Sequence, residues 1–282
     1  MKKNNIIFAI GLCLLIPGIV SAHQPRMPEG SQITVTDPEI SKAYYSKLEG
    51  KTHTYSISSD KAFSLYVNIL VPDIEGQKKD VSAVIIRNRD VESPTALNGN
   101  DFEWKKFFEP FGNDTYWKGP EYREKVGPGI YEIIVSSPNK DSKYSLAIGE
   151  IESFSLGETI NALTLIPKIK SDFFNESPVG FIFSPFGFGL LLIMFVLAFA
   201  FGFIYQLILR KMAQSTARKV HKNIGTSDRL LRLAIAIGLL AWAITTSWSP
   251  ILLFFSGFVF FEAIFSWCGL YAALGKSTCP LE

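Results

Sequence analysis

FGFGLLLIMFVLAFAFGFIYQLIL, residues 186–209, contains no charged side chain and is followed directly by Arg210 and Lys211. About 24 residues exceed the roughly 20 that an α-helix needs to cross the hydrocarbon core of a bilayer. We therefore expect a first transmembrane helix over 186–209. This helix divides the chain into a long part before the membrane and a short part after it.

Two further apolar segments follow a basic loop at 210–229. Residues 230–275 predict a two-helix hairpin that turns at Ser247-Trp248-Ser249-Pro250, and 276–282 form a tail. Aromatic residues such as Trp248 favour the headgroup level of a bilayer. Short loops rich in Lys and Arg stay on the cytoplasmic side, so the C-terminus is expected to be cytoplasmic and the part before 186 exported.

The first 22 residues support the same orientation. They combine two lysines, a short apolar core, a Pro-Gly break and a small-residue end, Val20-Ser21-Ala22. This pattern is typical of a bacterial secretory signal peptide rather than a spanning helix. Cleavage after Ala22 would leave His23 as the mature N-terminus, in an inner or plasma membrane protein of the cell envelope.

Residues 23–155 predict an exported β domain, and 156–185 a juxtamembrane linker. Short runs with period-two alternation are separated by polar turns, which favours a β-sandwich or jelly roll. The expected strands lie at 32–36, 52–57, 63–71, 81–86, 129–136 and 143–148. The fold class is thus β plus membrane α, an exported sandwich or jelly roll followed by three transmembrane helices.

The last of these strands, 129–136 and 143–148, resemble the final hairpin of bacterial pre-peptidase C-terminal-type domains. That resemblance implies an exported accessory module, usually without enzymatic activity. The rest of the sequence agrees with a non-enzyme, since it contains no Gly-x-Ser-x-Gly elbow, no His-Glu-x-x-His and no phosphate-binding glycine loop. A net charge of +2 gives no reason to expect nucleic acid as a partner.

An unusually aromatic stretch at 102–120 interrupts the strand pattern. It offers a candidate binding loop for a carbohydrate or an envelope protein, or else a long connection that its own aromatic side chains pin to the sandwich. The candidate platform residues are Trp104, Phe111, Tyr116 and Trp117.

The chain has three histidines, and two of them suggest a metal. The α-amine and imidazole of a mature N-terminal His23 would chelate copper, which favours nitrogen ligands, and His53 would supply a third nitrogen. This resembles the histidine brace of periplasmic copper-carrier sandwiches. The alternative is that His23 is only the first residue of a frayed terminus, and the fold requires no cofactor.

Two motifs frame the C-terminal hairpin: Lys222 to Arg232 reads KNIGTSDRLLR, and Cys268 to Cys279 reads CGLYAALGKSTC. Together they resemble the YgaP-like inner-membrane domain, which begins Asn-x-Gly-x-x-Asp-Arg-x-x-Arg and ends Cys-x-x-Tyr-x-x-x-Gly-x-x-Thr-Cys. The resemblance implies a hairpin that can form homodimers, and its members are often fused to a cytoplasmic sulfur-transfer domain that this chain lacks. The matching residues are Asn223, Gly225, Asp228, Arg229, Arg232, Tyr271 and Gly275.

Glu262 is an ionisable residue at membrane depth, which by default suggests function. Folding the hairpin at 248–250 brings it near Arg232, so we expect an ion pair, with a protonated carboxyl on a transport path as the alternative. Arg229 and Arg232 are otherwise expected to reach anionic lipid headgroups.

Cys268 and Cys279 face the reducing cytoplasm, where stable disulfides are rare. A continuous helix would separate them by about 16 Å, too far for a disulfide. Cys268 then acts as a small hydrophobic residue, and Cys279 is the more reactive candidate.

Three functions remain open from the sequence. The first is a non-enzymatic binding module that the bilayer-embedded hairpin anchors. The second is a sulfur, thiol or small-solute membrane protein that uses Cys268, Cys279 and Glu262. The third is periplasmic copper binding through His23.

Overall fold

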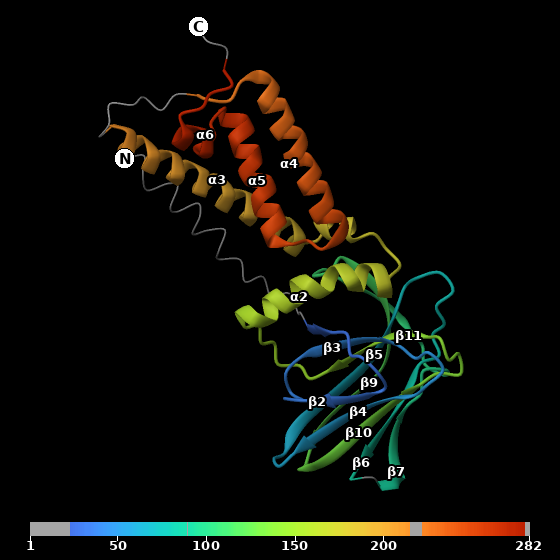
Figure 1. Cartoon of the computed structure of the whole chain (residues 1–282). Helices are drawn as coiled ribbons and strands as arrows, with labels where there is room; N and C mark the ends of the chain where they lie inside the picture. Colours follow the sequence, from blue (N-terminus) through green and yellow to red (C-terminus); the bar gives the residue numbers. More distant parts are fainter. Residues whose placement is uncertain (1–22, 89, 215–221, 280–282) are drawn as a thin grey trace.

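The computed structural model describes residues 23–88, 90–214 and 222–279. The predicted signal peptide and the centre of the basic loop, 215–221, lie outside these residues. A β-rich part comes first in the chain and a helical part follows it (Figure 1).

The β-rich part consists of two sheets. Strands of the six-stranded sheet follow the order β1 (Gln24–Arg26), β3 (Lys42–Lys47), β11 (Lys143–Ile148), β5 (Phe63–Pro72), β9 (Asp114–Val126) and β8 (Lys105–Glu109). The five-stranded sheet has the order β2 (Gln32–Val35), β4 (His53–Ser59), β10 (Gly129–Ser136), β6 (Ser82–Arg87) and β7 (Asp90–Leu97). Neighbours pair antiparallel except β1 with β3 and β2 with β4.

The two sheets enclose one hydrophobic core. Alternate residues point inward, such as Tyr55 and Ile57 from β4 and Leu65 and Val67 from β5, all fully buried. The alternation in the sequence predicts β2, β4, β5, β6, β10 and β11. It misses β1, β3, β7, β8 and β9.

The predicted linker is an ordered helical segment. It comprises α2 (Leu156–Lys168), the π-helix η1 (Ile169–Phe173) and the 3₁₀-helix η2 (Pro178–Phe183). The Ser155 side chain accepts a hydrogen bond from the Glu158 N–H at 3.2 Å and so begins α2. Figure 1 shows α2 lying between the sandwich and the membrane helices.

The helices that follow are α3 (Pro185–Gln214), α4 (Thr226–Thr246), α5 (Pro250–Phe265) and α6 (Gly269–Leu274). Two of them are long and apolar enough to cross a membrane, α3 over Pro185–Leu209 and α4 over Thr226–Thr246. The third predicted span is not one helix. α5 ends at Phe265 because Ser266 adopts a left-handed conformation with φ 54°, and α6 starts again three residues later.

The α4–α5 turn packs on η2. Trp248 is fully buried, with its ring 5.0 Å from that of Phe181 in an edge-to-face contact. Its indole N–H donates to the Pro178 carbonyl at 2.8 Å. Trp248 is therefore covered by protein, and its expected depth at headgroup level stays a prediction.

Candidate functional site

The two C-terminal motifs meet at the break between α5 and α6, and Asn223 joins them. Its side-chain amide donates to the Cys268 carbonyl at 2.8 Å, and its amide oxygen accepts from the Cys268 N–H at 2.7 Å. Its backbone carbonyl accepts from the Thr278 N–H at 3.0 Å. The asparagine thus ties the start of α4, the α5–α6 break and the C-terminal tail together.

Gly225 and Asp228 extend this contact on the tail side. The Gly225 N–H donates to the Thr278 hydroxyl at 2.9 Å, and that hydroxyl donates to the Asp228 carboxylate at 3.0 Å. A Cβ at position 225 would overlap the Thr278 carbonyl, so the close approach requires glycine here. Thr278 is a motif residue whose role became evident only from the fold.

A charged cluster lies on the membrane side of the same contact. Arg232 binds Asp228 at 3.0 Å and Glu262 at 2.5 Å, and its guanidinium carbon is 5.2 Å from the Tyr271 ring centroid. Glu262 is only 6% exposed. The ion pair expected from the hairpin register is present, and it holds the Arg232 guanidinium against α5. Arg229 donates instead to the Ala263 carbonyl at 2.9 Å, near the end of α5.

Both C-terminal cysteines are free thiols at this cluster. Cys268 is buried and its thiol faces the Glu262 carboxylate. Cys279 is half-buried, with its sulfur 3.7 Å from the Lys222 carbonyl. A straight-helix separation does not apply, because the chain breaks at Ser266 and the tail folds back to the start of α4. The two cysteines therefore flank the Lys222-Asn223 segment.

A second polar cluster joins the sandwich to the juxtamembrane helices. Lys170 of η1 is 0% exposed and bonds the carboxylate of Asp114, at the start of β9. It also donates to the Asn113 carbonyl at 3.2 Å. Burial raises the pKa of Asp114 to about 7, although the Lys170 charge opposes this shift. Nothing in the sequence marked this pair, since the two residues lie far apart in the chain.

Glu109 shapes the β8–β9 turn beside this pair. Its carboxylate accepts from the Phe111 and Gly112 N–H groups, both at 2.7 Å. Burial raises the pKa of Glu109 above its usual value, and the two backbone donors lower it in part. Glu109 and Asp114 line a small cavity of about 40 Å³ together with His23.

The structure does not bring His23 and His53 together. His23 bonds the Ser41 hydroxyl at the start of β3, whereas His53 lies 2.8 Å from the hydroxyl of Tyr144, which pairs with Ser46 near the end of β3. Five residues of extended strand separate these contacts by about 16 Å. Within residues 23–88, 90–214 and 222–279, no cluster of three or more His, Cys, Asp or Glu side chains is arranged to hold a metal. The predicted pairing of His23 with His53 at one copper ion is therefore wrong.

The four aromatic candidates also do not form one platform, because the stretch at 102–120 is the β8–β9 hairpin. Trp104 is buried in the sandwich core, and the ring of Phe111 contacts that of Phe186 of α3, with centroids 4.5 Å apart. Tyr116 is buried 5.1 Å from Phe174, whereas the Trp117 indole donates to Asp73 at 2.8 Å. The hairpin thus connects the sandwich to the helices, and the loop expected there is not present.

An open groove of about 430 Å³ lies between the sandwich and η1. The 27–31 loop, the β3–β4 turn and Phe173 of η1 contribute to its walls. Its charged lining residues are Lys47, Glu49, Lys51, Lys143 and Asp172. His53 also lines it, 7% exposed, and a buried hydroxyl pair, Tyr144 and Tyr55 at 2.9 Å, lies behind the imidazole. Burial lowers the pKa of His53 and so favours its neutral form.

The C-terminal part is similar to a known family of membrane domains. Residues 220–282 match the model described as inner membrane protein YgaP-like, transmembrane domain. With the apolar helices α3 and α4, this match identifies a membrane protein. No curated protein matches the chain.

Three solved structures are similar to the β-rich part. The pre-peptidase C-terminal domain of a collagenase from Bacillus anthracis is 13% identical, with a TM-score of 0.27, over 45% of this chain and 95% of that one. CorA, a surface-associated copper-binding protein of Methylomicrobium album BG8, is 7% identical, with a TM-score of 0.24, over 45% of this chain and all of that one. A β-glucosidase from Paenibacillus barengoltzii is 10% identical, with a TM-score of 0.21, over 45% of this chain but 12% of that one. Scores this low say nothing about ligand or activity.

Proposed function

We propose that the protein is a membrane-anchored binding module, in which an exported sandwich is held at a fixed orientation on the membrane helices and does not catalyse a reaction. The observation that carries the proposal is the contact between the sandwich and the helices that follow it. The buried Lys170–Asp114 pair and the contact between the Phe111 and Phe186 rings connect the sandwich to η1 and α3. Buried charges and aromatic contacts of this kind favour one orientation over a free tether.

The charge pattern supports an exported sandwich and a cytoplasmic C-terminus. Arg210 and Lys211 follow the apolar run of α3, and several further lysines and arginines precede α4. Short loops with this bias remain in the cytoplasm. The sandwich, on the other side of α3, then lies outside the membrane.

The groove beside η1 is the binding site that we propose. Its volume of about 430 Å³ is in the range of natural ligand sites, and Lys47 and Lys51 border a buried imidazole. This lining suits an envelope protein segment or a carbohydrate that presents acidic or hydroxyl groups. The Arg232–Glu262 cluster has the contacts of an anchor, since each of its charges has a partner within the hairpin.

Site-specific photo-crosslinking in native membranes tests the groove. We expect a photo-crosslinking amino acid at Lys51, which lines the groove, to form discrete adducts. The matched control is Lys61, also exposed but beyond the other end of β4. Adducts at Lys51 that are absent at Lys61 would support the groove as the binding site. Equal or no adducts at the two positions would contradict it.

A further inference from the structure

The first half of α2 presents apolar side chains away from the sandwich. The second half of the helix is already packed against the protein, since Ala162, Leu163 and Ile166 are buried. Four apolar side chains nevertheless remain exposed from the end of the sandwich into α2: Ile151, Phe154, Leu156 and Ile160. Leu156 is 79% exposed and Ile160 55% exposed.

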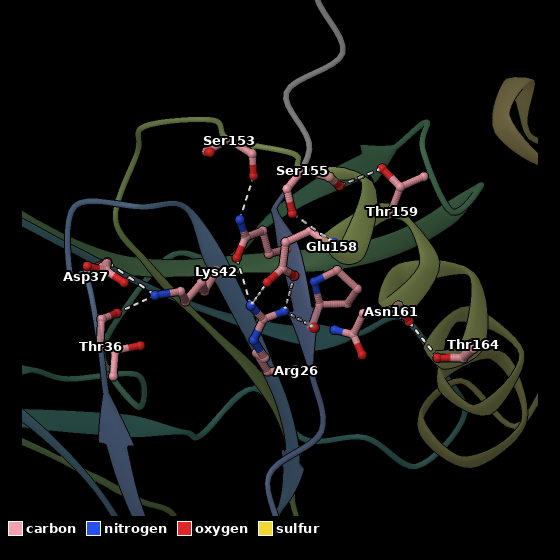
Figure 2. A network of polar contacts seen from close by, with 12 residues as sticks. Arg26, Thr36, Asp37, Lys42, Ser153, Ser155, Glu158, Thr159, Asn161 and Thr164 are labelled. Atoms are coloured by element: carbon pink, nitrogen blue, oxygen red, sulfur yellow. Dashed lines mark hydrogen bonds and ion pairs between the residues drawn. The ribbon is translucent and has the colours of Figure 1, made fainter.

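Polar contacts fix the rotation of α2 that exposes these side chains. Arg26 of β1 forms a two-point ion pair with Glu158, both distances being 2.9 Å, as Figure 2 shows. Two residues along a helix correspond to about 200° of rotation. Glu158 therefore points toward β1, while Leu156 and Ile160 point to the opposite side.

The exposed apolar surface is continuous with the start of the first membrane helix. Phe154 contacts Phe111, with ring centroids 6.4 Å apart, and Phe111 contacts Phe186 at 4.5 Å. Phe188, two residues further along α3, is also exposed. Figure 1 shows α2 running across the end of the membrane helices, where a bilayer surface would lie.

We propose that the first half of α2 is an interfacial helix, with Leu156 and Ile160 inserted at the boundary between headgroups and acyl chains of the outer leaflet. The occupant of this face is thus lipid. Helices that lie in this plane bury an apolar face a few ångströms below the headgroups. The contact would hold the sandwich at a set height and tilt over the membrane, beyond what the anchor alone determines.

Spin-label accessibility of the full chain in liposomes distinguishes lipid from other occupants. A nitroxide is attached to a single cysteine, Leu156→Cys or Ile160→Cys, with Cys13→Ala, Cys268→Ala and Cys279→Ala. The control is Ile130→Cys, at an exposed isoleucine at the start of β10. Relative to this control, we expect several-fold higher collision with oxygen and several-fold lower collision with a water-soluble nickel chelate. Low values for both reagents would indicate a protein partner, and high nickel collision would indicate water; either result overturns the proposal.

A second measurement uses the natural sequence, so that it does not depend on the cysteine changes. The protein is reconstituted with a phospholipid whose photoactivatable group lies near the headgroup end of the acyl chain. Mass spectrometry should find adducts in peptides covering 151–160 and none in those covering 129–136. Equal labelling of the two segments, or no adducts at 151–160, would overturn the proposal.

Discussion

Replacing Asp114 with alanine is expected to lower the free energy of unfolding of the sandwich by about 3–5 kcal/mol at pH 8, because Lys170 would keep a buried charge without its main partner. Both side chains are at most 5% exposed. Urea unfolding of the protein in nanodiscs, followed by tryptophan fluorescence, measures the change. A loss below about 1 kcal/mol, typical of exposed pairs, would show that the pair does not hold the sandwich against η1.

The paired variant Asp114→Leu with Lys170→Met is the control. Replacing both charges by apolar groups of similar volume is often neutral or stabilising, so this variant should recover most of the loss.

The raised pKa of Asp114 also predicts that the stability of the sandwich depends on pH. This pKa is raised from 3.8 to about 7 in the folded protein, so between these pH values the folded protein keeps a proton that the unfolded chain has lost. The free energy of unfolding therefore falls as the pH rises from 3.8 to about 7. Asp114→Asn should remove this part of the pH profile.

Arg232→Ala should destabilise the membrane hairpin by about 3–5 kcal/mol, because it leaves Glu262 buried without a charged partner. The side chains of the two residues are 17% and 7% exposed. Unfolding in mixed micelles with increasing fractions of denaturing detergent measures this change. No loss of stability would contradict the structural role of the pair.

The double variant Arg232→Met with Glu262→Met distinguishes a purely structural role of this pair from a role in binding or transport. An anchor needs only a packed hairpin, so this variant should be close to the natural protein in stability and should give the same crosslinks at Lys51. A stable double variant that loses the Lys51 crosslinks would assign Glu262 a role in binding or transport, against the anchor proposal.

The sequence was sufficient for features that depend on local composition. The uncharged run of α3, the alternation in β5 and β10 and the two C-terminal motifs are visible in short windows, and the structure contains each of them. The register of the α4–α5 hairpin also brought Arg232 to Glu262, since that estimate needed only the position of the turn.

Features that depend on one residue's conformation or on distant partners were not visible. The run from 250 to 274 is apolar throughout its first part, and hydropathy cannot detect that Ser266 turns left-handed and ends α5. Lys170 and Asp114 are 56 residues apart, and each lies in a segment without a motif. The stretch at 102–120 misled because its aromatic side chains suggested a surface platform. Trp104 instead packs in the core before β8, Phe111 lies in the β8–β9 turn, and Tyr116 and Trp117 on β9 belong to different clusters.

The proposed function requires the sandwich and the C-terminal tail to lie on opposite sides of the membrane. Labelling with a membrane-impermeant maleimide tests this in membrane vesicles of known orientation, using Ile130→Cys as an exposed thiol on the sandwich. The expected result is that right-side-out vesicles label the introduced thiol and leave Cys279 unlabelled, while inside-out vesicles label Cys279 alone. Labelling of Cys279 and the introduced thiol from the same side would contradict the account.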